Sequence, residues 1–232
     1  MSEARLRAFE SRPALDAQIA SEVAAALIEA VTLRGKASLV VSGGSTPGGF
    51  FKALRDKPVD WSRLTVSLAD DRWVPPSHAD SNERLLREVL LCGPASAAQC
   101  ISLVTADAHP KAAESTISER LAQLATFDVV VLGMGSDGHF ASLFPDSAAL
   151  LPGLDMHSER TVIASDPPAA AHARMTLTLP RLLDTRHLFV HIVGQEKRTV
   201  LERAAIDKDP RSLPIAAVLA SESPAAKVYW AP

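Results

Sequence analysis

Short runs of apolar and β-branched residues alternate with longer amphipathic stretches along almost the whole of this 232-residue chain. Such alternation predicts parallel strands joined by crossover helices, because each helix returns the chain to the same edge of the sheet. Several runs, such as residues 129–132, are apolar at every position, which indicates strands with both faces covered. The strands are predicted at residues 38–41, 64–68, 101–104, 128–132, 161–164, 175–179, 187–193 and 228–230.

The predicted fold class is α/β: a mostly parallel, doubly wound, Rossmann-like sheet with helices on both faces and few extra strands. The clearest helix is expected at residues 13–34, where an apolar residue recurs at every fourth position from Leu15 to Val31 and Gly35 marks the end. Further helices are expected at residues 82–91, 112–124 and 196–205. No internal repeat or long linker interrupts the pattern, so residues 1–232 are expected to form a single domain.

Composition and charge exclude several classes of partner. The formal net charge is −3 and the Lys and Arg residues are scattered, so no nucleic acid is expected to bind. No apolar segment approaches the length of a membrane span and the N-terminus lacks a signal-peptide pattern, so no membrane is expected either. Cys92 and Cys100 lack CxxC spacing, which indicates ordinary thiols in a reducing, cytoplasmic compartment.

The first unusual loop, residues 42–49, reads Ser-Gly-Gly-Ser-Thr-Pro-Gly-Gly and follows a predicted strand. Thr46 is a favoured N-cap and Pro47 a favoured first helical residue, so a helix is expected to begin here. Glycines permit close approach of the backbone, and a helix N-terminus offers free amides to an anion. The Lys–Ser/Thr pair of a nucleotide P-loop is missing. A plain tight turn remains an equal alternative from this loop alone.

The second loop, residues 69–82, places Asp70 and Asp71 beside Arg72 at the end of a predicted strand. Asp80 and Glu83 have the spacing of a capping box, so Asp80 is expected to cap the helix at 82–91. Taken alone, this loop favours a solvated acidic turn with Arg72 as a surface partner.

The third loop, residues 132–145, contains Gly133, Gly135 and Gly138 in the GxGxxG pattern. A dinucleotide site is not expected, because Pro145 interrupts the long helix that this pattern needs and no strand ends near an acidic residue about 20 positions on. What remains is a glycine-rich loop that carries Asp137 and His139. Small residues around His139 leave room for a substrate.

The other histidines show weaker signals. His78, His109, His157 and His187 are expected in loops or at element ends, and His191 is expected to pack inside a strand. His172 lies near Arg174 and is kept as a minor candidate. The chain has no G-x-S-x-G elbow, no H-E-x-x-H and no Cys/His spacing typical of metal sites. Hydrolysis would therefore use water activated by a side chain, with no metal and no cofactor.

Taken together, the motifs resemble the glucosamine-6-phosphate isomerase/6-phosphogluconolactonase superfamily over nearly the whole chain, in the family's order. They are SGGSTP at 42–47, DDRWVPPSHADSN at 70–82, GMGSDGHFASLFP at 133–145, RMTLTLP at 174–180 and VGQEK at 193–197. The deaminase branch has a tyrosine where this chain has Arg72, and a glutamate that assists ring opening where this chain has Phe144. The resemblance therefore favours the lactonase branch. The chain departs from it at Asp71, usually glutamate and expected to matter little if peripheral, and at Phe140, usually threonine.

The resemblance implies hydrolysis of 6-phosphogluconolactone, with His139 as general base. Arg72 or amides of the glycine loops would stabilise the oxyanion, and Asp70 would orient either substrate hydroxyls or the Arg72 guanidinium. Gly135 and Asp137 are possible supports of the His139 loop. The phosphate would lie on Gly43, Gly44, Ser45 and Thr46, with Arg174 and Lys197 as counter-charges.

The expected partner is a small sugar phosphate, and the expected state is a monomer or a small homo-oligomer. The first alternative is an enzyme of the glucosamine-6-phosphate deaminase type. The second is a sugar-phosphate effector domain that binds without catalysis. That reading has little support, because the chain shows neither spare length nor a basic patch for a DNA-binding module.

Overall fold

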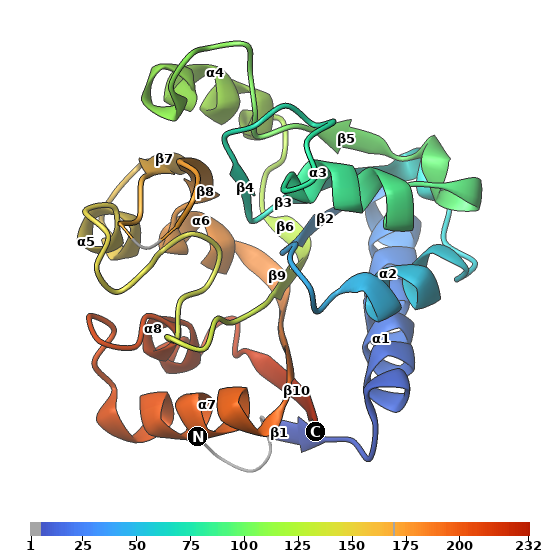
Figure 1. Ribbon diagram of the computed structural model, residues 1–232. Helices are drawn as coiled ribbons and strands as arrows, with labels where there is room; N and C mark the ends of the chain where they lie inside the picture. The colour runs from blue at the N-terminus through green and yellow to red at the C-terminus, as the bar shows by residue number, and fades with distance from the viewer. Residues whose placement is uncertain (1–5, 169) are drawn as a thin grey trace.

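A seven-stranded sheet runs through the centre of the computed structural model, which describes residues 6–168 and 170–232 (Figure 1). The strand order is β1-β10-β9-β6-β2-β3-β5, and every neighbouring pair is parallel. This confirms the predicted fold class. The strands are β1 (Leu6–Ala8), β2 (Ala37–Val41), β3 (Leu64–Leu68), β5 (Gln99–Ile101), β6 (Phe127–Leu132), β9 (Thr185–Val193) and β10 (Lys227–Ala231).

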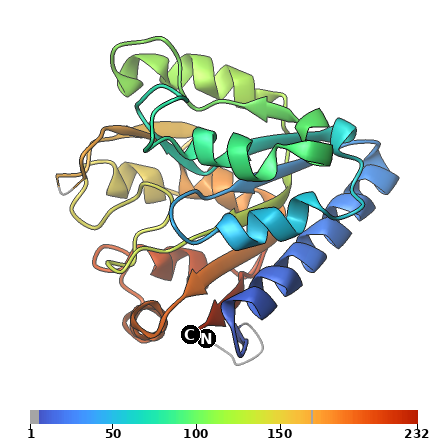
Figure 2. The same cartoon turned by 45° about the vertical axis from the view of Figure 1, so that its right-hand side comes forward.

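Helices cover both faces of this sheet. One layer holds α1 (Arg12–Arg34), α2 (Gly48–Arg55) and α3 (Asn82–Leu85), and the opposite layer holds α6 (Leu179–Leu183), α7 (Gln195–Asp207) and α8 (Ile215–Ala220) (Figures 1 and 2). The remaining helices are α4 (Pro110–Ala122), α5 (Leu150–Leu154), the 3₁₀ turns η2 (Trp61–Arg63) and η4 (Gly93–Ala97), and the π-helical turn η3 (Leu86–Leu90). None of the helices among the described residues is long and apolar enough to cross a membrane.

The boundaries of α1 follow from the sequence as expected. The Ser11 hydroxyl accepts a hydrogen bond from the Ala14 amide, and Gly35 ends the helix at a φ of 73°, where glycine avoids the strain of a side chain. The apolar stripe from Leu15 to Leu27 is fully buried against the sheet. Each such aliphatic side chain stabilises the fold by about 1.5–3 kcal/mol.

A second, three-stranded antiparallel sheet contains β4 (Asp70–Arg72), β8 (Arg174–Leu177) and β7 (Val162–Ser165) in the order β4-β8-β7. The strands predicted at 161–164 and 175–179 therefore exist with shifted bounds, but outside the parallel sheet. The prediction that residues 70–72 belong to a loop was wrong. Backbone bonds from Ala69 to Val41 and from Leu177 to Ala69 connect the two sheets and draw this segment into pairing.

Two predicted helix caps were also wrong. Helix α2 begins at Gly48 rather than at a Thr46 cap, because Arg12 donates to the carbonyls of Ser45 and Thr46 and holds them in a loop. Ser81, not Asp80, caps α3 through its hydroxyl, which accepts from the Arg84 amide at 3.1 Å. The helix predicted at 82–91 continues beyond α3 only as the single π turn η3.

The strand order brings the informative loops together. Strands β2 and β6 are neighbours in the sheet: β3 and β5 follow on the side of β2, and β9 and β10 on the side of β6. The strand order therefore reverses between β2 and β6, and open α/β sheets bind ligands at the carboxyl ends of the strands at such a point. The loops after β2, β6 and β9 therefore meet at one edge of the sheet, next to the small antiparallel sheet.

Candidate active site

A cavity of about 250 Å³ lies at this edge. Ten of the eleven residues predicted for the site line it, and the eleventh, Asp137, contacts His139 from outside the lining. The predicted lining residues are Gly43, Gly44, Ser45, Thr46, Asp70, Arg72, Gly135, His139, Arg174 and Lys197. The structure therefore brings together loops that are far apart in the sequence.

The lining is positively charged although the chain as a whole is negative. Its ionisable residues other than histidine are the three cations Arg72, Arg174 and Lys197 and the single carboxylate Asp70. Among the described residues, the buried Nε atoms of both arginines have no hydrogen-bond partner. Buried donors of this kind need an acceptor. The cavity is thus suited to an anion rich in acceptor oxygens.

The loop after β2 approaches its neighbours too closely for side chains. A Cβ at Gly43 would lie 2.2 Å from the Asn82 side chain, and Gly44 has a φ of 89°. The Ser42 amide donates to the Val131 carbonyl, which ties this loop to β6. The glycines are therefore required by the geometry, beyond the plain turn that the sequence alone allowed.

Two buried residues support this loop from behind: Asp16, which sequence reasoning missed, and His191, which it expected to pack inside a strand. The His191 Nε2 lies 3.0 Å from the Asp16 Oδ1, and a Cβ at Gly49 would meet the other Asp16 oxygen at 2.0 Å. His191 is only 3% exposed, as expected for a strand residue, yet it also lines the cavity. Its position in a strand gave no signal of this second contact.

His139 is held on two sides. Its Nδ1 lies 2.5 Å from the Asp137 Oδ1, and its ring stacks on Phe144 with centroids 4.0 Å apart. Although partial burial opposes it, the hydrogen bond with His139 lowers the pKa of Asp137 overall. An ionised Asp137 suits the tautomer that carries its proton on Nδ1, in which Nε2 has the lone pair.

The His139 loop is closed by its own backbone. The Gly135 amide donates to the His139 carbonyl, and a Cβ at Gly135 would lie 2.2 Å from the imidazole ring. Just beyond, Ala141 has a φ of 47°, in the left-handed region that non-glycine residues rarely occupy. Such backbone conformations concentrate at functional sites.

Asp70 is fixed by two partners on the cavity wall. Its Oδ2 accepts from the Ser142 hydroxyl at 2.5 Å and lies 3.7 Å from the Arg174 Nη1. The Arg174 guanidinium also lies 5.2 Å from the centre of the Phe144 ring. Within the described part of the chain, Asp70 therefore pairs with Arg174, and of its two possible roles the one toward the Arg72 guanidinium has no direct contact in the structure.

Arg72 is oriented instead by Asn82, which sequence reasoning missed. The Arg72 Nη1 donates to the Asn82 Oδ1 and to the Asp80 carbonyl, both at 2.8 Å. Asn82 also donates to the Asp70 carbonyl at 3.0 Å. The same side chain fills the space that Gly43 leaves open, so it couples the glycine loop to the small sheet.

Asp71 is not peripheral. It is fully buried, and its carboxylate accepts from the amides of Asn82 and Glu83 at 2.7 and 2.9 Å. Burial raises the pKa of Asp71 to about 6, although these amide bonds oppose the shift. A carboxylate at the start of α3 also interacts favourably with the free amides there.

Lys197 projects from the first turn of α7, directly after β9, and lines the cavity together with the glycine loop. Burial lowers the pKa of Lys197, and the nearby carboxylates of Glu196 and Asp137 oppose that shift. It reaches the site from the parallel sheet, whereas Arg174 reaches it from the small sheet.

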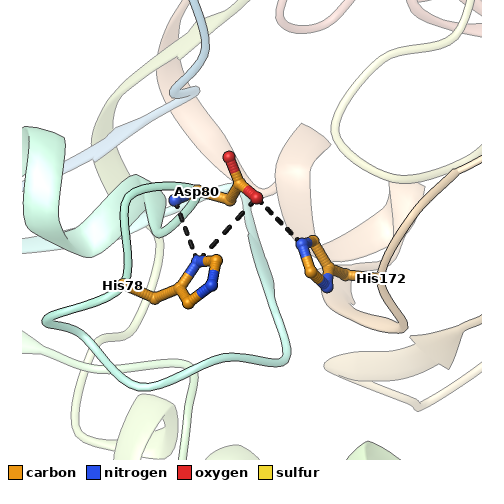
Figure 3. A group of neighbouring side chains, drawn as sticks. All are labelled: His78, Asp80 and His172. Carbon is orange, nitrogen blue, oxygen red and sulfur yellow. Dashed lines mark hydrogen bonds and ion pairs between the residues drawn. The ribbon is translucent and has the colours of Figure 1, made fainter.

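Away from the cavity, His78, Asp80 and His172 form a cluster that the sequence did not predict (Figure 3). The Asp80 Oδ2 lies 2.9 Å from the His172 Nε2 and 3.8 Å from the His78 Nδ1. His109 and His157 are exposed.

Comparison with known proteins identifies relatives over the full chain. Residues 10–230 match the family model described as glucosamine-6-phosphate isomerases/6-phosphogluconolactonase. A 6-phosphogluconolactonase from Rhizobium meliloti is 42% identical over 99% of both chains. One from Pseudomonas aeruginosa is also 42% identical, over 92% of this chain and 89% of its own.

Solved structures agree with these sequence matches. The crystal structure of a 6-phosphogluconolactonase from Shewanella baltica superposes with a TM-score of 0.96 at 42% identity. The superposition covers all of this chain and 99% of the other.

Proposed function

The chain belongs to the glucosamine-6-phosphate isomerase/6-phosphogluconolactonase family, and on that basis we propose that it hydrolyses 6-phosphogluconolactone to 6-phosphogluconate in the oxidative pentose phosphate pathway. It is an enzyme of the carboxylic ester hydrolase class, like the lactonases with which it shares 42% identity. The observation that carries the proposal is one cavity shared by His139, the glycine loop and three cations.

The reaction is attack of water on the carbonyl carbon of a cyclic ester. His139 takes a proton from the water through Nε2, because Asp137 occupies its Nδ1. The new C–O bond converts the carbonyl into a tetrahedral oxyanion, which Arg72 or amides of the glycine loops stabilise. The ring C–O bond then breaks, and the ring oxygen leaves with the proton that His139 returns.

The phosphate is the part of the substrate that gives affinity. The backbone amides and hydroxyls of residues 43–46 donate hydrogen bonds to its oxygens, with Lys197 and Arg174 as counter-charges. Arginine suits this task because its planar guanidinium donates two parallel hydrogen bonds to one phosphate. The positive lining supports an anionic substrate, and Asp70 in turn keeps Arg174 in place.

The deaminase alternative is disfavoured by one contact. Phe144 stands where the deaminase pattern has its glutamate, and its ring stacks on His139. An aromatic ring cannot carry the proton that ring opening of an amino sugar needs. Arg72 stands where that pattern has a tyrosine, and its Nη1 donates to the Asn82 side chain and the Asp80 carbonyl.

A turnover assay tests the proposal. Purified protein in EDTA should open 6-phosphogluconolactone well above the spontaneous rate, read immediately after mixing because the lactone also opens unaided. A loss of turnover that a divalent ion restores would contradict the metal-free mechanism. Release of ammonia from glucosamine 6-phosphate at a comparable rate would replace the lactonase proposal by the deaminase.

A further inference from the structure

Two loops that meet outside the substrate cavity carry the cluster of His78, Asp80 and His172 (Figure 3). The first two residues belong to the loop between β4 and α3, and His172 belongs to the loop between β7 and β8. One ligand atom from each lies within 4.8 Å of the other two. The side chains are 44%, 56% and 28% exposed, so solutes reach them.

The two imidazole nitrogens converge on one carboxylate oxygen. The His78 Nδ1 accepts the Asp80 amide proton at 3.1 Å, so its lone pair faces Asp80. The His172 Nε2 lies 2.9 Å from the Oδ2 of the same residue. The rings meet edge to face, with centroids 5.5 Å apart.

These distances match a metal coordination triangle. Zinc binds imidazole nitrogen and carboxylate oxygen at about 2.0–2.2 Å, which places tetrahedral ligand atoms about 3.3 Å apart. The two separations from the Asp80 Oδ2, 2.9 and 3.8 Å, bracket that value. The two imidazole nitrogens lie within 4.8 Å of each other, so a modest side-chain rotation would bring this third separation to the same value.

We propose that His78, Asp80 and His172 bind one divalent transition-metal ion of the zinc class, with water as the fourth ligand. Two imidazoles and one carboxylate favour zinc, cobalt or nickel over magnesium and calcium, which prefer oxygen ligands only. Binding displaces the proton shared by the His172 Nε2 and the Asp80 Oδ2, and that proton goes to solvent.

The ion joins the two loops and does not contact the substrate. None of the three ligands belongs to the cavity lining among the described residues. The connection to the active site runs through the Asp80 carbonyl, which accepts from Arg72 at 2.8 Å. The metal therefore fixes the loop whose Asp80 carbonyl accepts a hydrogen bond from Arg72. No step of the hydrolysis uses the ion.

The test is a titration of chelator-stripped protein with Zn²⁺ alone, followed by isothermal calorimetry. The wild type should bind one zinc per chain, and zinc should raise its Tm. His172→Ala and His78→Ala should each weaken binding by at least about 10-fold, since even residues that only contact a metal ligand contribute that much. His157→Ala removes an exposed histidine elsewhere and should bind as the wild type does.

A second measurement separates loss of the metal site from loss of the fold. Co²⁺ should give the visible absorption of a four-coordinate nitrogen–oxygen site in the wild type and not in His172→Ala. A Tm in EDTA equal to that of the wild type shows that the variant is folded. Equal zinc affinity in the wild type and His172→Ala, or absence of saturable binding at one zinc per chain, would overturn the proposal.

Discussion

The two walls of the cavity are built in opposite ways. The parallel-sheet wall consists of the loops after β2 and β6, where backbone and glycines approach so closely that a Cβ at Gly43 or Gly135 would meet a neighbour at 2.2 Å. The wall from the small antiparallel sheet consists of charged side chains, each fixed by another polar group, such as Asp70 by Ser142. The first wall depends on shape and the second on charge.

This difference predicts how each wall fails. Added atoms disturb the backbone wall even when they carry no charge. Removal of one charged partner disturbs the other wall, because a buried ion without its partner is strongly destabilising. The two walls meet at Phe144, whose ring stacks on His139 of the backbone wall and lies 5.2 Å from the Arg174 guanidinium of the charged wall.

The largest effect is expected on the backbone wall. His139→Ala should lower kcat by about 10²–10⁴-fold, because it removes the group that moves the proton. Stopped-flow or early-time titration of released acid measures the rate before spontaneous opening dominates. The far-UV circular dichroism spectrum should stay unchanged.

Two further variants serve as comparisons for His139→Ala. His109→Ala, at an exposed site, should keep wild-type turnover. Asp137→Asn keeps the size of the side chain but weakens the bond to the His139 Nδ1, so it should lower kcat by less than His139→Ala does. Turnover largely retained in His139→Ala would reduce that residue to a structural part of the loop.

The next effect compares one cation from each wall. Lys197→Ala and Arg174→Ala should each lower kcat/KM on the phosphorylated lactone by about 10- to 150-fold, the equivalent of one charge-assisted hydrogen bond of about 1.5–3 kcal/mol. Lys197→Ala should barely change the rate on unphosphorylated gluconolactone, and Arg174→Ala should lower it less than it lowers the rate on the phosphorylated lactone, because it also leaves Asp70 without its ion partner. Equal losses on the two lactones would assign the residue to the fold or the chemistry rather than to the phosphate.

The last effect concerns the pH dependence of the stability of the charged wall, and it leaves turnover aside. Burial raises the pKa of Asp71 to about 6, above its ordinary value of 3.8. The folded state thus favours the protonated form of Asp71. The resulting contribution to the free energy of unfolding is fully present below about pH 4 and is lost as the pH rises through about 6. Relative to Asp71→Asn, the free energy of unfolding of the wild type should fall by at most about 3 kcal/mol between pH 4 and pH 7.

Urea unfolding at several pH values measures this difference, with the exposed Asp146→Asn as a control that should show no such trend. A difference that instead grows with pH would mean that the amide bonds from Asn82 and Glu83 outweigh burial.

The contrast between the two walls also explains which parts of the site could be predicted from the sequence. Glycine loops after strands, and a histidine within one of them, are local signals, so the Gly43–Thr46 loop and His139 could be found without the structure. The contacts of Asp70 with Ser142 and of His172 with Asp80 join residues 72 and 92 positions apart. They depend on how the small sheet docks, which no local pattern encodes.

The wrong helix caps have the same origin. Thr46 has the chemistry of a cap, yet Arg12, from another element, holds its carbonyl in the loop. Asp80 has capping-box spacing, yet the helix start is satisfied by Ser81 and, from β4, by Asp71. Both residues have the side-chain chemistry of a helix cap, but tertiary contacts override this local preference.

A crystal structure with bound 6-phosphogluconate tests the central claim most directly. We expect the phosphate oxygens within about 2.7–3.2 Å of the amides of residues 44–46 and of Lys197 Nζ, with the carboxyl carbon of the product facing the His139 Nε2. A phosphate bound beside His139, with the carboxyl group on the Gly43–Thr46 loop, would contradict the assignment of both walls.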